Sequence, residues 1–157
     1  MKSIITTIEK IGQSLEIGDF TFNSDGYLSV ILHEQHTVHF QLNESQNTLN
    51  LYAEIADLTH IKSVNLLSEL LKENYFSQEK NHFHFSINPE TNWLLLFKSI
   101  DEPMIDPSIL KSLIDNLLEA IIYWQKHINN FLQDNLNKKM QQNKYQIPAN
   151  KFSFISR

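Results

Sequence analysis

The chain has 157 residues, 41% of them hydrophobic and 11% aromatic, which is enough to bury the core of a single folded domain. It contains no cysteine, and this excludes a disulfide framework, a thiolate nucleophile and a cysteine-ligated metal. Its formal net charge of −5 disfavours binding to nucleic acid, and no uncharged stretch is long enough to insert across a membrane.

Residues 3–16 carry apolar side chains at helical spacing, which predicts an amphipathic helix. The stripe consists of Ile4, Ile8, Ile11 and Leu15. Glu9 and Lys10 interrupt the apolar run before it is long enough for an export signal. We therefore expect the protein to stay in the compartment where it is made.

Three runs of alternating residues between positions 28 and 55 predict an antiparallel meander of three strands. The apolar face of the meander comprises Leu28, Val30 and Leu32 of the first run, Val38, Phe40 and Leu42 of the second, and Leu49, Leu51, Ala53 and Ile55 of the third. The alternate positions are mostly polar, as at Ser29, His39 and Gln41. This alternation is typical of a sheet with one face on the core and one face in water.

Ser63 is a predicted N-cap for a helix over residues 64–74. The apolar positions of this helix are Val64, Leu66, Leu67, Leu70 and Leu71. They span too wide an arc for burial against a single surface. We expect the helix to contact its own sheet on one side and a second subunit on the other. The alternative is that both sides are buried within one monomer.

A second hairpin is predicted over residues 83–97, in which Phe83, Phe85 and Ile87 alternate before the apolar run 93–97 returns. A run of five apolar residues indicates a strand that is covered on both of its faces.

Asp106 followed by Pro107 is a strong start signal for a last helix, because an acidic N-cap precedes a proline at the first helical position. We expect this helix to run for about 25–30 residues, or roughly 40–45 Å. Its apolar stripe consists of Leu110, Ile114, Leu117, Ile121, Trp124, Ile128 and Phe131.

Charge is divided unevenly along the chain. Residues 1–136 hold all 18 acidic residues against eight lysines, a net charge of −10. Residues 137–157 hold five basic residues and no acidic one. We therefore expect one domain over residues 1–136 and a basic C-terminal extension over residues 137–157 that is mobile unless it docks.

Histidines are the only candidate catalytic or metal-binding side chains present in any number. His82 and His84 would share one face of a strand, and His33, His36 and His39 surround a predicted hairpin turn. A zinc site usually has further oriented ligands, which this spacing does not indicate. Phosphate-loop and nucleophile-elbow motifs are absent from the sequence. We expect no cofactor, no metal and no catalytic residue, and a metal-dependent enzyme using His82, His84 and a turn histidine is the weakest hypothesis.

The order of the predicted elements and several local stretches resemble the class I type III secretion chaperones of the CesT (Tir-chaperone) family, over about residues 3–132. The stretches that carry the resemblance are FTFN at 20–23, DGYL at 25–28, LNLYAEI at 49–55, VNLLSELLKENYF at 64–76 and WLLLF at 93–97. The fold class expected is α+β, a single domain of order α-β-β-β-α-β-β-α. Helices would pack on an antiparallel twisted sheet, and the domain would form a homodimer.

The resemblance also implies a function. Such a chaperone binds the N-terminal segment of one or more secreted effector proteins in the bacterial cytoplasm, holds it extended without ATP and keeps it ready for type III secretion. The ATPase of the secretion apparatus is a further candidate partner. An adaptor or regulatory protein-binding module of the same fold, with no role in secretion, is the alternative.

The regions that the family uses imply two sets of surface residues. Effector binding is expected at Ile5, Ile8, Phe40, Leu49 and Leu51, each of which could instead belong to the monomer core. The dimer interface is expected at Val64, Leu67, Leu70, Leu71, Phe83, Phe85 and Trp93.

Overall fold

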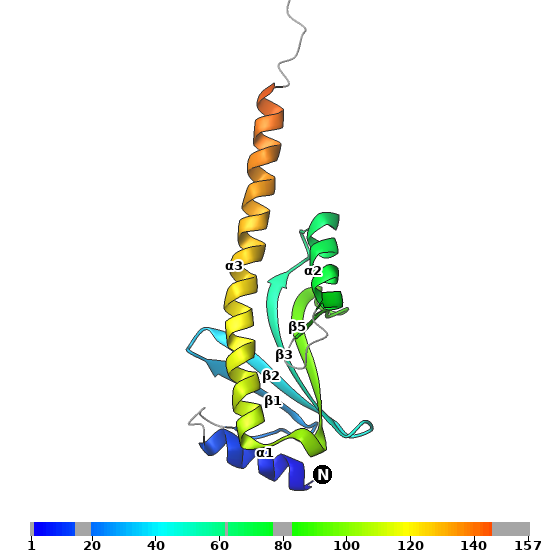
Figure 1. Cartoon of the computed structure of the whole chain (residues 1–157), viewed down its shortest axis with the longest axis vertical. Coiled ribbons are helices and arrows are strands. Elements are labelled where there is room, and N and C mark those ends of the chain that lie inside the picture. The colour runs from blue at the N-terminus through cyan, green and yellow to red at the C-terminus, as the bar shows by residue number, and fades with distance from the viewer. Residues whose placement is uncertain (1, 15–19, 62, 77–82, 146–157) are drawn as a thin grey trace, which may run out of the picture.

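The computed structural model describes residues 2–14, 20–61, 63–76 and 83–145 (Figure 1). Its elements are α1 (Lys2–Ser14), β1 (Tyr27–Leu32), β2 (His36–Asn43), β3 (Thr48–Asp57), α2 (Val64–Phe76), β4 (His84–Ile87), β5 (Trp93–Asp101), a short 3-10 helix η1 (Glu102–Met104) and α3 (Pro107–Tyr145). The predicted α+β class and the predicted order of elements are confirmed.

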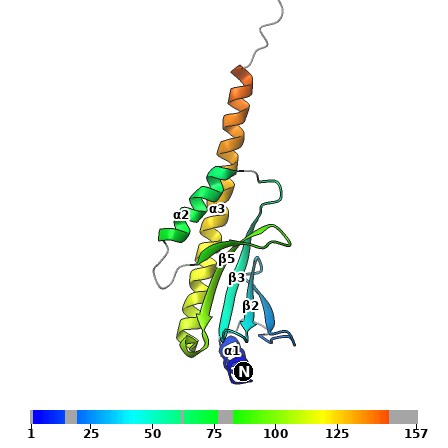
Figure 2. The same ribbon diagram turned by 90° about the vertical axis from the view of Figure 1, so that its right-hand side faces the viewer.

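The five strands form one antiparallel sheet in the order β1-β2-β3-β5-β4. The central strand β3 therefore pairs with β2 and β5, and β1 and β4 are the two edges. Figures 1 and 2 show α3 along one face of the sheet, which we call the inner face, with α1 at one end and α2 beside the β4 edge. The opposite side of the sheet is the outer face.

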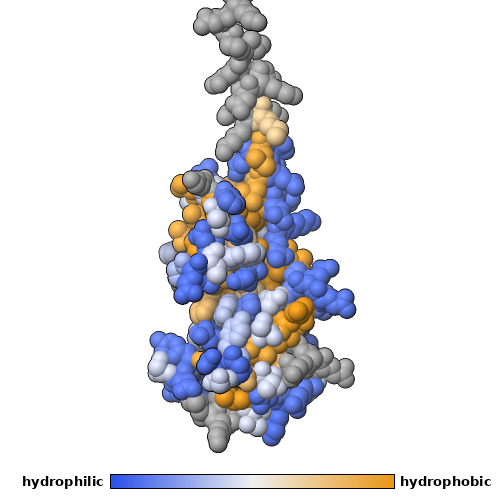
Figure 3. Space-filling view, turned by 180° about the vertical axis from the view of Figure 1, so that it is seen from behind, coloured by the Kyte–Doolittle hydropathy of each residue, from blue (hydrophilic) through white to orange (hydrophobic). Residues whose placement is uncertain are grey.

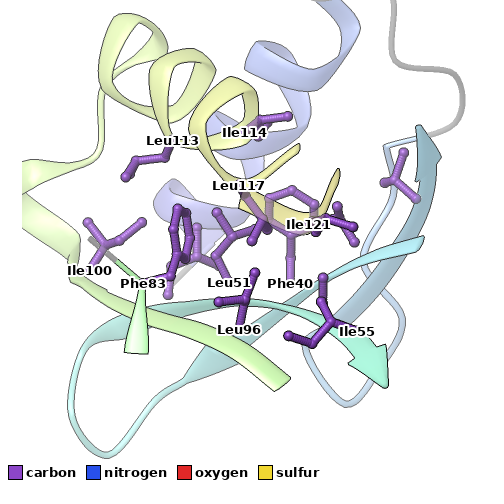
Figure 4. Packing of buried hydrophobic residues seen from close by; sticks show 14 of the residues in the cluster. Phe40, Leu51, Ile55, Phe83, Leu96, Ile100, Leu113, Ile114, Leu117 and Ile121 are labelled. Atoms are coloured by element: carbon purple, nitrogen blue, oxygen red, sulfur yellow. The ribbon is translucent and has the colours of Figure 1, made fainter. Parts of the chain in front are cut away.

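The core lies between the inner face and α3. Phe40 of β2, Leu51 of β3 and Leu96 of β5 meet Leu117 and Ile121 of α3, and all five side chains are buried (Figure 4). Complete burial of one such side chain stabilises the fold by about 1.5–3 kcal/mol. The alternation predicted for the meander is confirmed, since its apolar positions are buried or half-buried on this face.

Both predicted helix starts are confirmed by their capping bonds. The Leu66 N–H donates to Ser63 Oγ at 3.3 Å, and the Ile109 N–H donates to Asp106 Oδ1 at 2.9 Å. Each bond satisfies one of the backbone donors that a helix leaves free in its first turn.

Helix α3 is longer than predicted, at 39 residues or about 58 Å. After Phe131 its apolar stripe thins, but no glycine or proline interrupts the chain before Pro148, and lysine, glutamine and methionine favour helix. The helix passes through position 136 without a break, so the domain boundary placed there stays a prediction. Mobility was predicted for residues 137–157. Residues 137–145 belong to α3, and residues 146–157 lie outside the described residues.

Within the described residues of one protomer, β5 is completely covered on its inner face only, so coverage of its outer face stays a prediction. Leu94 and Leu96 are buried on the inner face, whereas Trp93, Leu95 and Phe97 are only half-buried on the outer face. The long apolar run therefore leaves hydrophobic surface on the outer face of the sheet.

Helix α1 approaches the sheet through Gly12. A Cβ atom added at Gly12 would lie 2.0 Å from Cγ of Phe20, which is far closer than van der Waals contact. Phe20 is itself buried and stands edge-on to Phe40, with ring centroids 5.0 Å apart. The ring has no free space to move into, so only glycine fits at this point of α1.

Replacing Gly12 with alanine is expected to lower the free energy of unfolding by about 1–3 kcal/mol, although alanine favours helix. The cause is overpacking against Phe20, and urea denaturation measures it. Gln13→Ala, at an exposed neighbouring position, is the control and should stay within about 0.5 kcal/mol of the wild type. A Gly12→Ala variant as stable as the wild type would contradict this account of how α1 packs.

Candidate functional site

Helix α2 is buried on one side only. Leu66 and Leu70 are 0% and 2% exposed and belong to the core, whereas Val64 and Leu71 are 81% and 66% exposed. A groove on the open side is lined by Val64, Leu67, Ser68, Leu71, Lys72 and Tyr75. Apolar surface at α2 and along the upper part of α3 is visible on the side shown in Figure 3. We call the set Val64, Leu67, Leu71 and Tyr75 the α2 face.

The structure divides the residues predicted for the dimer interface. Val64, Leu67 and Leu71 lie on the α2 face, and Trp93 is half-buried on the outer face of β5.

The other three predicted interface residues make contacts within the monomer. Leu70 follows Leu66 by one helical turn and is buried with it, and strand alternation places Phe83 and Phe85 on the inner face. Phe85 stands edge-on to Trp124 of α3, with ring centroids 4.7 Å apart. Leu70 and Phe83 are therefore core residues, which corrects the prediction that they form a subunit interface. Phe85 is half-buried, and its place in the interface stays a prediction.

A second uncovered feature is the free edge of β1. The Leu42 N–H donates to Gly26 O at 2.8 Å, and in an antiparallel pair such bonded positions recur at every second residue. The backbone N–H and C=O groups of Leu28, Val30 and Leu32 consequently point to β2. Those of Tyr27, Ser29 and Ile31 point away from the sheet.

Asn23 bonds to the outward backbone groups of Tyr27, the first of these three residues. Its side-chain Oδ1 accepts from the Tyr27 N–H at 2.9 Å, and its own N–H donates to Tyr27 O at 2.9 Å. Within the described residues nothing pairs with the outward backbone groups of Ser29 and Ile31. The Ile31 side chain is 67% exposed beside them. β1 thus offers two donors and two acceptors, next to an apolar side chain.

Four of the five residues predicted for effector contact are buried instead. Ile8, Phe40, Leu49 and Leu51 are at most 1% exposed, which leaves them no surface for a partner in this conformation. They take the core role that the sequence also allowed, because strand and helix periodicity points them at α3. Ile5 is half-buried at the margin of the core.

The outer face carries an aromatic row that the sequence analysis missed. The ring of His39 stacks on Tyr27 and Tyr52, with centroids 5.8 and 4.9 Å apart, and the Tyr27 hydroxyl bonds to His39 Nδ1. Tyr52 in turn pairs with Phe97 of β5. The signal was available, because Tyr52 and Phe97 occupy outward positions of their strands.

Partial burial disfavours the charged forms of two members of this row. Desolvation lowers the pKa of His39, although the nearby Glu54 opposes the effect. Desolvation, followed by the charge and hydrogen bond of Tyr27 and the charge of Glu54, raises the pKa of Tyr52 to about 12. The row is therefore an apolar, hydrogen-bonded surface and not a charged one.

The histidines give no metal centre in the part of the chain that is described. No group of three or more histidine and acidic side chains there could hold a metal ion. His84 is exposed on β4, and His82 lies outside the described residues. None of the helices in the described ranges has the length and apolar character needed to cross a membrane.

Comparison with solved structures shows where this architecture recurs. The chain resembles a chain of the ExsC–ExsE complex, with 17% identity, a TM-score of 0.69 and coverage of 80% of this chain and 92% of that one. It also resembles a chain of the HopA1–SchA chaperone–effector complex, with 16% identity, a TM-score of 0.68 and coverage of 80% and 98%. A third match is a chain of the complex of the Yersinia pestis type III secretion chaperone SycH with a fragment of YscM2, at 17% identity, a TM-score of 0.62 and coverage of 76% and 98%.

These identities are low, so the structural matches show the fold alone. No curated protein sequence matches the chain. The model of the Tir chaperone protein (CesT) family matches residues 6–125. That range is well over half of the sequence, and the protein therefore belongs to the Tir chaperone protein (CesT) family.

Proposed function

We propose that this protein is a homodimeric chaperone of the bacterial cytoplasm that binds an N-terminal segment of one or more type III secretion effectors in extended form. It acts by binding and catalyses no reaction. The observation that carries the proposal is the pair of uncovered features on a fold of this family, the open β1 edge and the α2 face. The chaperone–effector complex among the similar structures supports it.

The β1 edge suits an extended protein segment. An added strand would bond to the outward backbone groups of Ser29 and Ile31 and could lay apolar side chains against Ile31. Backbone bonds of this kind are independent of sequence, which suits a chaperone with more than one client. Ordering a disordered segment costs about 2–5 kcal/mol, so the segment must also contact further surface.

The α2 face suits a second copy of the chain. Val64, Leu71 and Tyr75 are exposed and lie on the same side of one helix, spaced seven and four residues apart. Two-fold symmetry places the α2 face of one copy against the α2 face of the other, so a single interface buries both faces. The half-buried Trp93, Leu95 and Phe97 on the outer face of β5 extend the apolar surface available to the dimer. Contact with the ATPase of the secretion apparatus stays a prediction.

The double variant Val64→Asp with Leu71→Asp is expected to be a monomer of 18.4 kDa, whereas the wild type should have about twice that mass. The reason is that dimerisation would bury unpaired carboxylates. Multi-angle light scattering measures the mass. Both side chains are exposed in the protomer, so the variant should keep its circular dichroism spectrum and melting temperature.

Met104→Asp is the matched control for this experiment, because Met104 is an apolar residue with 62% exposure that lies in η1, away from α2. It should leave the dimer intact. A monomeric wild type would refute the homodimer. A double variant that stays dimeric would show that the α2 face is not the interface.

Ser29→Pro is expected to weaken capture of effector segments by about tenfold or more, because proline removes an outward backbone donor and places its ring at the edge. Pairing with β2 does not use this N–H, and proline is tolerated on edge strands, so the domain should still fold. Binding of N-terminal segments of secreted proteins from the same bacterium, measured by pulldown and calorimetry, tests this.

Ser29→Ala keeps the backbone donor and should bind as the wild type does. If Ser29→Pro also binds with unchanged affinity, the segment does not use the β1 edge. If the wild-type protein retains no segment from any secreted protein, the proposed function itself is wrong.

A further inference from the structure

The side chain of Asn74, near the end of α2, pairs with both backbone polar groups of Phe85 in β4. Its Nδ2 donates to Phe85 O at 3.1 Å, and its Oδ1 accepts from the Phe85 N–H at 2.6 Å. One side-chain amide thereby makes the pair of bonds that a neighbouring strand would make.

These bonds lie on the free edge of the sheet. Phe85 is aligned with Leu96 of β5, and the groups that Asn74 occupies are the ones that point away from that strand. A free edge of this kind is a template for pairing with other chains. Ile87, the other outward position of β4, is the last residue of the strand and is followed by the turn that contains Pro89. Asn74 thus occupies the outward groups of one of the two outward residues of β4, whereas those of Ser29 and Ile31 on β1 are both open.

The two bonds also fix α2 relative to the sheet. Asn74 lies one helical turn after Leu70, which is in the core, and Leu71, which is on the α2 face. The two bonds therefore act at the end of α2 that carries part of the α2 face. A second polar contact between α2 and the body, from His127 to Glu69, measures 3.7 Å between half-exposed side chains. Such exposed pairs contribute little. By contrast, Asn74 makes two hydrogen bonds, and both are short and partly buried.

We propose that Asn74 is a positioning residue that holds α2 against β4 and so presents the α2 face in the orientation that dimerisation requires. The proposal rests on the proposed homodimer. Asparagine is suited to the role because it offers one donor and one acceptor at the right reach. Aspartate keeps only the acceptor at neutral pH, and leucine, of similar size, offers neither.

The first measurement is amide hydrogen exchange at Phe85, by NMR, on the full-length protein. Exchange is expected to be about tenfold faster or more in Asn74→Leu, because the acceptor of this N–H is lost. Asn74→Asp should lie between Asn74→Leu and the wild type, because its carboxylate still accepts the bond. Asn65→Ala, at an exposed position of the same helix, is the control and should leave exchange unchanged.

The second measurement is the dimer dissociation constant, by sedimentation equilibrium. Asn74→Leu and Asn74→Asp are both expected to raise it about tenfold, although Asn74 is not on the α2 face. Gly12→Ala serves as a second control, because it destabilises the protomer at the distant α1 contact and should leave the dissociation constant unchanged. This separates positioning of α2 from general loss of stability.

Unchanged Phe85 exchange in Asn74→Leu would overturn the proposal. It would also be overturned if exchange became faster while the dissociation constant stayed at the wild-type value, or if Gly12→Ala weakened the dimer as much as Asn74→Leu. A wild-type protein that is monomeric would refute the homodimer and with it the positioning role. Phe85 exchange would then still report whether the Asn74 pair exists.

Discussion

Burial of one sheet face under a single long helix is the constraint on which the rest of the structure depends. Five strands spaced about 4.8 Å apart make a sheet roughly 20 Å wide, whereas a helix with its side chains is about 10–12 Å across. Helix α3 therefore covers the middle of the inner face, over β3 and β5. The margins are left to α1 and α2, and no described helix remains for the outer face.

At each edge of the sheet, an asparagine side chain bonds to outward backbone groups of the edge strand, but at a different position along the strand. Asn23 occupies the outward groups of Tyr27 at the start of β1 and leaves those of Ser29 and Ile31 open. Asn74 occupies those of Phe85 in the middle of the shorter strand β4. Both side chains take the place of a missing neighbouring strand, one at the end of its edge and the other at the centre. This difference in position makes β1 the better template for an added strand.

The sequence predicted the elements well because their signals are local. Periodicity located the strands and helices, and the capping residues Ser63 and Asp106 marked the helix starts that the structure has. The end of α3 was placed too early, because the prediction followed the apolar stripe although the polar residues after Phe131 also favour helix.

Assignment of apolar residues to core or surface could not be read from the sequence. Leu70 and Leu71 are chemically identical neighbours about 100° apart on α2, and only the position of the sheet decides that the first is buried and the second exposed. Phe83 and Phe85 likewise alternate correctly, but the face that they share is the inner one. The open edge of β1 depends on the order of strands in the sheet, which no local pattern contains.

The length of α3 gives the molecule an electrical polarity along its longest axis (Figure 1). Asp134 is the last acidic residue, so the far end of this helix carries only positive side-chain charge, whereas the sheet and its surrounding elements carry the acidic excess. Such a separated distribution is a permanent dipole, and the field of another macromolecule exerts a torque on it before contact. The molecules are consequently oriented before they collide. An acidic macromolecule approaches the end of α3 first, whereas a basic one approaches the end that carries the sheet.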